Sequence, residues 1–195
     1  INSIKPQSDI FSVPFHFFPQ RVIFTNYQNL FEVIPFARYL LNSFIITIGV
    51  TVLGILISSL AGFAFAKYDF PYKRLLFTIV VASLMLPIYV LLIPLYLFIT
   101  KIGWMDTYVG VIVPFTAMGA VSGFGVFLMR QHMISLPTAL LDAARIDGSS
   151  EFRLYWQFSL PTAKPALVTL GIIAFMLSWN NFLWPLVVLK SSEKF

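Results

Sequence analysis

The sequence contains no cysteine and few charged residues. Zero cysteines exclude disulfides, thiolate metal sites and a cysteine nucleophile. Charged residues make up only 11% of the chain, whereas an ordinary soluble domain carries about 25%. So few charges cannot cover the surface of a water-soluble globule, and an apolar fraction of 58% excludes a disordered chain. The composition therefore predicts an integral membrane protein.

The sequence also lacks the residue patterns of several functional classes. No Gly-x-x-x-x-Gly-Lys-Ser/Thr string occurs, so we expect this chain neither to bind ATP nor to carry catalytic residues. His16 and His132 have no second ligand at metal spacing, which argues against a metal site. The formal net charge of +5 is scattered, which argues against a nucleic-acid partner. Asp9, Asp69 and Asp106 lie outside or at the edges of the apolar stretches, unlike the buried relays of proton-driven transporters.

Four apolar stretches are long enough to cross a bilayer as helices. They are bounded by charged residues and cover about residues 39–66, 75–100, 107–129 and 165–189. A spanning helix needs about 20 mostly apolar residues, and a charge at its centre costs about 2.5–3.5 kcal/mol. The four charge-free windows therefore predict an all-α, multi-pass protein embedded in the lipid bilayer.

Small residues within these stretches predict close helix packing. Ser58 with Gly62, and Gly119 with Gly123, stand four residues apart, a spacing that lets another helix approach. The alternative is chance, because small residues are common in membrane helices.

Two prolines interrupt the second stretch. Pro87 and Pro94 lie two helical turns apart, and each removes a backbone donor and favours a kink. Kinks are typical of mobile bundles, although static bundles also carry them.

Residues 1–38 differ in composition from the rest of the chain. Phenylalanines alternate there with prolines and polar residues. This mixture predicts an extracellular or periplasmic interfacial segment that rests against the bilayer or a neighbouring subunit. Residues 39–190 form the predicted transmembrane domain.

Residues 130–164 are the one long stretch with both charge and a helical pattern. Pro137 suits the first turn of a helix, and Gly148 supplies a stop, because glycine readily adopts the left-handed conformation that ends helices. Ser149 is placed to cap a second helix, which Leu160-Pro161 would end. The loop is thus predicted to be a short helix, a glycine turn and a second short helix.

Two interpretations of this loop are open from its residues. It suits docking of a soluble partner, because Ala143 and Ala144 are small and Asp142 and Arg145 are placed to pair with the partner's charges. It also suits an amphipathic connector lying on the lipid headgroups, since four aromatic side chains are available as anchors: Phe152, Tyr155, Trp156 and Phe158.

A specific motif lies within this loop. Residues 141–148 read Leu-Asp-Ala-Ala-Arg-Ile-Asp-Gly, and Leu160-Pro161 follows at a fixed distance. This arrangement resembles the EAA loop of ABC importer permeases, in which Glu-Ala-Ala, three residues and Gly precede nine residues and Ile-x-Leu-Pro. The chain departs from that pattern at Asp142, which replaces Glu, and at Phe158, which replaces Ile. Aspartate keeps the charge but shortens the reach toward an ATPase by one methylene.

Further strings extend the resemblance over nearly the whole chain. Residues 35–43, 93–96 and 179–185 are similar to the carbohydrate-uptake branch, and to its second permease, the equivalent of the smaller membrane subunit of maltose importers. This resemblance implies a type I, maltose-type helical bundle with a cytoplasmic coupling loop at 130–164. Six spans are usual in such a bundle, so we expect that the first and the last are missing here.

The resemblance also implies a function. It implies a permease subunit in the plasma or inner membrane that forms half of the pore of an ATP-driven, binding-protein-dependent sugar importer. The implied partners are a second permease subunit, two ATPase subunits that bind the ATP, and an extracellular sugar-binding protein. The chain itself would be neither an enzyme nor a cofactor carrier. Polyol or glycerol-phosphate import is an alternative, and a secondary transporter, a channel and a non-transport scaffold are rival classes.

Two sets of candidate functional residues follow. The resemblance assigns coupling to the ATPase to six residues of the loop: Asp142, Ala143, Ala144, Arg145, Asp147 and Gly148. A possible substrate path consists of residues that combine aromatic faces with amide groups, as a hydroxylated ring requires: Trp179, Asn180, Asn181 and Trp184. The alternative for this second set is an aromatic belt with helix–helix hydrogen bonds.

Overall fold

The structure, a computed structural model, describes residues 1–11, 13, 16–19, 21–118 and 121–191. Every regular element in these ranges is a helix. The chain divides into two compact units, Ile1–Asn42 and Ser43–Phe195. The all-α bundle predicted from composition is confirmed, and the second unit carries the features that matter for function.

The first unit consists of short helices around one buried lysine. Its elements are η1 (Asn2–Ile4), α1 (Gln7–Ile10) and α2 (Thr25–Val33). Lys5 is 1% exposed, and its Nζ donates to the carbonyl of His16 at 2.5 Å. The Asn26 side chain donates to the carbonyls of Ser3 and Lys5, both at 3.0 Å. These bonds tie α2 to the first residues of the chain.

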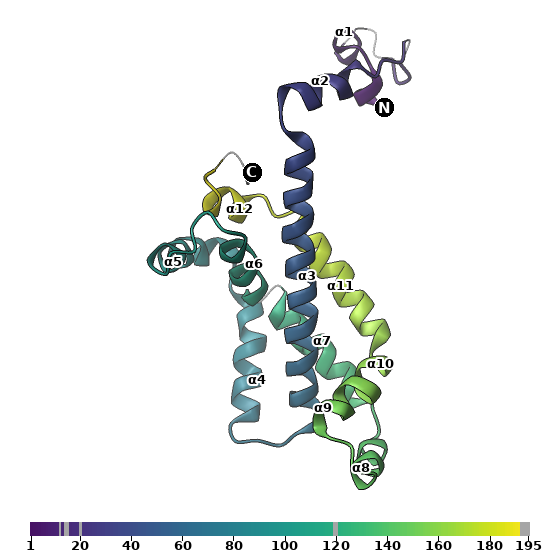
Figure 1. Cartoon of the computed structure of the whole chain (residues 1–195), viewed down its shortest axis with the longest axis vertical. Helices are drawn as coiled ribbons and strands as arrows, with labels where there is room; N and C mark the ends of the chain where they lie inside the picture. The colour runs from purple at the N-terminus through teal and green to yellow at the C-terminus, as the bar shows by residue number, and fades with distance from the viewer. Residues whose placement is uncertain (12, 14–15, 20, 119–120, 192–195) are drawn as a thin grey trace. The chain divides into compact units, whose positions relative to one another are not determined.

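Helix α3 (Phe36–Lys67) is the longest element (Figure 1). It has 32 residues and is, within the described ranges, the one continuous helix long and apolar enough to cross a membrane. Its apolar run carries no charge between Arg38 and Lys67, which is why the sequence predicts it clearly. At 1.5 Å per residue it exceeds the roughly 30 Å of the hydrocarbon core.

The second apolar stretch forms two helices rather than one. Helix α4 (Lys73–Ala82) and the 3-10 turn η2 (Ser83–Met85) meet α5 (Ile88–Lys101) at an angle of 105°. The break falls at Pro87, which precedes α5, whereas α5 continues through Pro94. The turn is therefore far larger than a kink within one spanning helix, and α5 runs across the direction of α4 (Figure 1).

The third stretch is also bent, and the helix of the fourth stretch meets the end of the loop at an angle. Helices α6 (Tyr108–Ala117) and α7 (Ser122–Ile134) meet at 49°, and the segment α9–α10 (Glu151–Thr162) meets α11 (Lys164–Trp179) at 80°. Counting each bent pair as one crossing brings the described chain to as many as four spans. The fourth apolar stretch does not continue as one helix to residue 189, because α11 ends at Trp179 and α12 (Leu183–Val188) follows separately.

Two groups of buried apolar side chains hold the second unit together. The first group joins α3, α5, α6 and α12, and its buried members include Val50, Ile99, Val111 and Trp184. The second group, which we call the loop cluster, joins α3, α7 and α11 to the segment 136–163. Its buried members are Phe63, Met129, Met133, Leu141, Ala144, Leu154, Tyr155, Ala163, Ala166 and Leu170. The segment 136–163 is thus part of the core rather than a detached connector.

Small residues allow α3 and α7 to pack closely. A Cβ added at Gly62 would lie 2.6 Å from the Cβ of Met129, and one added at Gly125 would lie 2.2 Å from the Oγ of Ser58. Both distances are shorter than van der Waals contact. The pair Ser58 and Gly62 therefore faces α7, the close approach that its spacing predicts.

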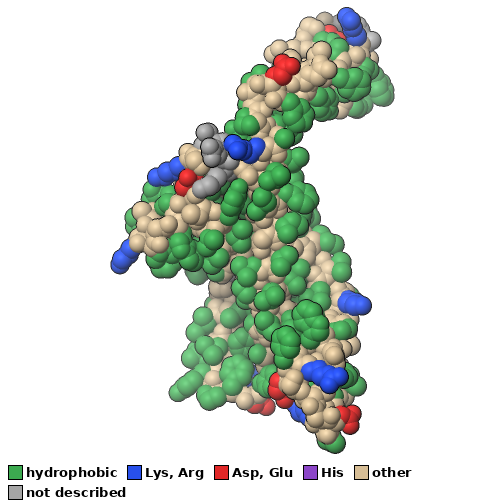
Figure 2. Space-filling model, viewed as in Figure 1, with side chains coloured by type: hydrophobic (Ala, Val, Ile, Leu, Met, Phe, Trp, Pro, Cys, Tyr) green, Lys and Arg blue, Asp and Glu red, His purple; other side chains and the backbone are tan. Residues whose placement is uncertain are grey.

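Of the second pair of small residues, Gly119 and Gly123, the structure describes only Gly123. A Cβ added at Gly123 would lie 2.8 Å from the Oγ of Ser83, so α7 also packs closely on η2. Gly119 lies outside the described residues. Figure 2 shows that hydrophobic side chains dominate the visible surface along α3 and α4, with charged side chains near α8 and α9 and, at the other end of the second unit, near α5 and α12.

Candidate functional site

The predicted helix and glycine turn of the loop are present in the structure. Helix α8 (Thr138–Ile146) is followed by its C-cap, Asp147, and then by Gly148, which has a φ of +81°. The N–H of Gly148 donates to the backbone carbonyl of Arg145, and the N–H of Ser149 donates to the backbone carbonyl of Ala144, both at 2.9 Å. These two bonds are those of a Schellman motif, in which the residue after the helix adopts the left-handed conformation. Glycine is needed at 148 for its backbone conformation, since nothing lies within 4 Å of an added Cβ.

The second helical segment of the loop begins one residue later than predicted. The Oγ of Ser150, not of Ser149, accepts a hydrogen bond from the N–H of Arg153 at 3.4 Å and caps α9 (Glu151–Arg153). A π-helical segment, Leu154–Ser159, follows, and α10 (Leu160–Thr162) closes the loop. Leu160-Pro161 therefore lies in the last helical turn of the loop, which ends at Thr162, close to the predicted end.

Helix α8 has one buried face and one exposed face. Leu141 and Ala144 are 1% and 6% exposed and belong to the loop cluster. Ile146 is 87% exposed, and Leu140 and Ala143 are exposed beside it. The prediction that Ala143 and Ala144 both face a partner is therefore wrong for Ala144, which packs against the bundle.

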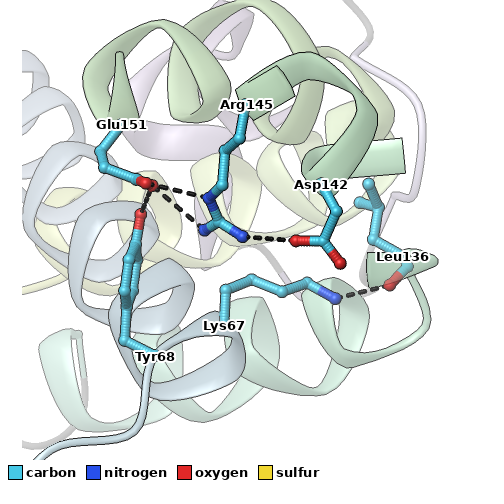
Figure 3. A network of polar contacts seen from close by, with 6 residues as sticks. All are labelled: Lys67, Tyr68, Leu136, Asp142, Arg145 and Glu151. Carbon is cyan, nitrogen blue, oxygen red and sulfur yellow. Dashed lines mark hydrogen bonds and ion pairs between the residues drawn. The ribbon is translucent and has the colours of Figure 1, made fainter. Parts of the chain in front are cut away.

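The charged residues of the loop contact one another. Arg145 donates from Nε and Nη2 to the two carboxylate oxygens of Glu151, at 3.0 and 3.2 Å, and from Nη1 to Asp142 at 2.8 Å (Figure 3). Tyr68, which follows α3, donates its hydroxyl hydrogen to Glu151. Asp142 and Arg145 were predicted to pair with a partner's charges, and in this structure they pair with each other. Asp147 is exposed at the end of α8.

This network shifts the protonation equilibria of its members. Hydrogen bonds from Arg145 and Tyr68 lower the pKa of Glu151, and the same carboxylate and that of Asp142 raise the pKa of Arg145. Desolvation and the bond to Glu151 raise the pKa of Tyr68 to about 12. The carboxylate and guanidinium therefore stay ionised at physiological pH. Their solvent exposure means that the pair fixes geometry more than it adds stability.

Four hydrogen bonds among the described residues join residues 130–164 to α3 or to Tyr68, which follows it. One runs from Arg130 Nε to the carbonyl of Phe65 at 3.3 Å. Besides the bond from Tyr68 to Glu151, Lys67 Nζ donates to the carbonyl of Leu136 at 2.5 Å (Figure 3). Deeper in the core, the hydroxyls of Ser59 and Tyr155 lie 2.7 Å apart in a hydrogen bond. The loop is thus bonded to Ser59, Phe65 and Lys67 of α3 and to Tyr68 just after it.

The aromatic side chains of the loop divide into two groups. Phe152 and Trp156 are 70% and 56% exposed, and their rings stack with centroids 6.3 Å apart. Tyr155 is 5% exposed, and Phe158 packs against the loop cluster. Of the four predicted surface anchors, Phe152 and Trp156 are available for a lipid surface, and Tyr155 is not.

The predicted substrate-path residues separate into two roles. Asn180 and Asn181 line two adjoining cavities at the end of α11. Trp184 contributes to one cavity wall, but it is 2% exposed and its indole N–H donates to the carbonyl of Val111 at 3.2 Å, so it is mainly a core residue. Trp179 lines neither cavity and stacks on Phe175 with centroids 5.7 Å apart.

Comparison with known proteins identifies the family. Residues 54–193 match the family described as binding-protein-dependent transport system inner membrane component. The chain belongs to this family. Its members are ABC importer permeases rather than enzymes, and they work with ATPase and binding-protein partners. The resemblance drawn from the loop motif is thereby confirmed.

Individual relatives cover most or all of the chain. It is 37% identical over 198 residues to the arabinooligosaccharides transport system permease protein AraQ of Bacillus subtilis. This alignment covers 100% of this chain and 69% of the relative. It is 33% identical over 191 residues to the sn-glycerol-3-phosphate transport system permease protein UgpE of Pectobacterium atrosepticum, with 95% of this chain and 66% of the relative. The chain therefore spans about two thirds of the length of these relatives.

A solved structure shares the fold. It is a bacterial ABC transporter involved in the import of the acidic polysaccharide alginate, with a TM-score of 0.86 and 23% sequence identity. The match covers 98% of this chain and 66% of that chain. The helical bundle of an ABC importer permease, which the sequence implies, is the fold observed.

Some contacting residues were not predicted from the sequence. Ser59, Tyr68 and Glu151 belong to no motif that the sequence analysis identifies. The pairing of Glu151 with Arg145 has a local signal, because the two residues flank the glycine turn six positions apart. Tyr68 and Ser59 are 83 and 96 residues from their partners, too far for any spacing rule.

Proposed function

We propose that the chain is a transmembrane permease subunit of an ATP-driven, binding-protein-dependent carbohydrate importer, and that it lines half of the translocation pore. Family membership over residues 54–193 supports the importer assignment. The observation that carries the mechanism is the loop, because one face of α8 is buried in the bundle while the opposite face is exposed.

The loop geometry suits the transmission of motion. A soluble ATPase that contacts the exposed face at Leu140, Ala143 and Ile146 would move α8 as a rigid unit, since Leu141 and Ala144 are packed in the loop cluster. The hydrogen bonds of the loop to α3 would pass this movement to a membrane helix. ATP binding and hydrolysis in the separate subunit would then alternate the access of the pore.

The assembly follows from the same family assignment. We infer a heterodimer with a second permease subunit, two ATPase subunits on the cytoplasmic side and an extracellular sugar-binding protein. The chain itself needs no cofactor, because the nucleotide is bound by the ATPase. The loop 130–164 lies in the cytoplasm, and the bundle crosses the plasma or inner membrane several times.

Relatives of this chain support a carbohydrate or related polyol as substrate. AraQ is named for arabino-oligosaccharides and UgpE for glycerol 3-phosphate, and both are similar over nearly the whole chain. A carbohydrate is the first candidate because the relative with 37% identity is named for one. Glycerol phosphate or another polyol is the second.

The test measures ATPase association and uptake in the assembled transporter. Ile146→Lys places a charge on the exposed face of α8 without touching the buried face. We expect the ATPase to be lost on copurification and uptake into proteoliposomes to fall at least tenfold. Tyr72→Lys is the matched control, because Tyr72 is 77% exposed in the short connection between α3 and α4. Unchanged association and uptake in Ile146→Lys would refute the role of α8.

A further inference from the structure

Three breaks in helical structure meet at one place in the second unit. They are the turn between η2 and α5, the end of α6 at Met118, and the segment 180–182 between α11 and α12. Two adjoining cavities, with volumes of about 350 and 490 Å³, are lined by residues from all three. At membrane depth, non-helical backbone is tolerated where it is buried in protein or lines a water-filled space. Discontinuous helices also form the substrate sites of many transporters.

The walls of these cavities are apolar with a few polar groups. Both cavities share the lining residues Ile88, Tyr89, Met118, Asn180 and Asn181. No Asp, Glu, Lys, Arg or His occurs among the described residues that line either cavity. Volumes of about 300–1,000 Å³ with mostly apolar walls and few directed polar groups are typical of small-molecule sites.

The two asparagines present complementary groups. Asn180 Nδ2 donates to the carbonyl of Met176 at 2.8 Å, so its Oδ1 remains an acceptor without a partner among the described residues. Asn181 Oδ1 accepts from the N–H of Trp184 at 3.4 Å, so its Nδ2 remains a donor. Asn180 thus offers an acceptor and Asn181 a donor in the lining of the same cavities, and a hydroxyl group, which both donates and accepts, can bond to either.

Tyr89 adds a third group of the same kind. It occupies the first turn of α5, its side chain is 72% exposed, and its hydroxyl has no hydrogen-bond partner within the described ranges. A phenol also donates and accepts, and its ring offers an apolar face to the C–H groups of a sugar. A charged ligand would instead require a cation or an anion in the wall, which these cavities lack.

We propose that this pair of cavities is a subsite for one unit of an uncharged, polyhydroxylated ligand, with Tyr89, Asn180 and Asn181 as its polar contacts. The proposal rests on the proposed transport function. It narrows the substrate class to neutral carbohydrates and excludes phosphorylated or acidic ones. It also replaces Trp179 and Trp184 by Tyr89 among the residues expected to touch the ligand.

The experiment measures ligand binding to the assembled transporter in nanodiscs, without binding protein, by equilibrium dialysis. The two probes are an uncharged arabinose trisaccharide and glycerol 3-phosphate. Tyr89→Phe removes one hydroxyl, and Asn181→Asp replaces the amide donor by an acceptor while keeping an oxygen for the N–H of Trp184. Trp179→Phe is the matched control outside the cavities. ATP hydrolysis stimulated by the binding protein, measured in the same preparations, shows whether each variant has assembled.

We expect the wild-type complex to bind the trisaccharide and not glycerol 3-phosphate. Each cavity variant should raise the Kd of the trisaccharide about three- to tenfold, the effect of one lost hydrogen bond, and the control should not change it. If ATP hydrolysis is stimulated but the complex prefers glycerol 3-phosphate, or if the Kd is unchanged in both cavity variants, the subsite is refuted and the transport function is not. Absence of stimulated ATP hydrolysis in the wild-type complex would instead refute the transport function.

Discussion

Replacement of Gly148 by valine should separate ATP hydrolysis from uptake. Gly148 has a φ of +81°, and an added Cβ would meet nothing within 4 Å, so the substitution acts through the backbone alone. A β-branched residue is badly strained at positive φ, and such a conformation costs about 1–3 kcal/mol. The loop can relieve this strain by giving up the Schellman bonds of Gly148 and Ser149, which would release the end of α8.

Gly103 provides a matched control for this prediction. Its φ is +74°, nothing lies within 4 Å of an added Cβ, and it follows α5, in a different connection of the chain. Gly103→Val should therefore cost a similar amount of stability without altering α8. The assay compares thermal unfolding, ATP hydrolysis and uptake in proteoliposomes. We expect both variants to unfold at lower temperature, and only Gly148→Val to hydrolyse ATP with little uptake. Equal uptake per ATP in the two variants would refute the coupling role.

Three further perturbations test the contacts of the loop and of α3. Tyr155→Phe should lower the free energy of unfolding by about 0.5–1.5 kcal/mol, measured by denaturation, because the bond to Ser59 is buried. The network lowers the pKa of Glu151 in the folded protein, so the ionised carboxylate stabilises the fold at pH values above the pKa of Glu151 in the unfolded chain. This stabilisation is lost as the pH falls through the lower pKa of the folded state. Glu151→Gln should therefore flatten the dependence of thermal stability on pH in this acidic range. Gly62→Ala should destabilise by about 1–3 kcal/mol through overpacking, whereas Gly171→Ala, with ordinary contact at 3.4 Å, should not. A stable Gly62→Ala protein would contradict the close packing of α3 on α7.

The sequence predicts what depends on local chemistry. Helix α3 is an uninterrupted apolar run between Arg38 and Lys67, and helix formation satisfies all its backbone groups in lipid. The stop at Gly148 depends on one residue type in one conformation. Both features are therefore readable from the residues themselves, as is the family motif of the loop.

Features that depend on tertiary packing could not be predicted from local sequence patterns. A proline at residue 87 predicts a bend but not 105°, because the direction of α5 depends on its neighbours. Hydropathy extends the fourth stretch to residue 189, whereas Asn180 ends α11 by bonding to Met176. The burial of Ala144 and exposure of Ala143 likewise follow from which face of α8 packs on the bundle.

The bonds between the loop and α3 also set an order of assembly. Lys67, Tyr68 and Ser59 meet partners 69, 83 and 96 residues further along the chain. At a synthesis rate of about 5–20 residues per second, α3 waits roughly 5–20 seconds before Tyr155 exists. Ser59 is suited to this delay, because its hydroxyl also donates to the carbonyl of Ile55, one turn earlier, at 2.6 Å. The helix can therefore enter the bilayer with this hydroxyl already bonded and gain the second bond, to Tyr155, when the loop arrives.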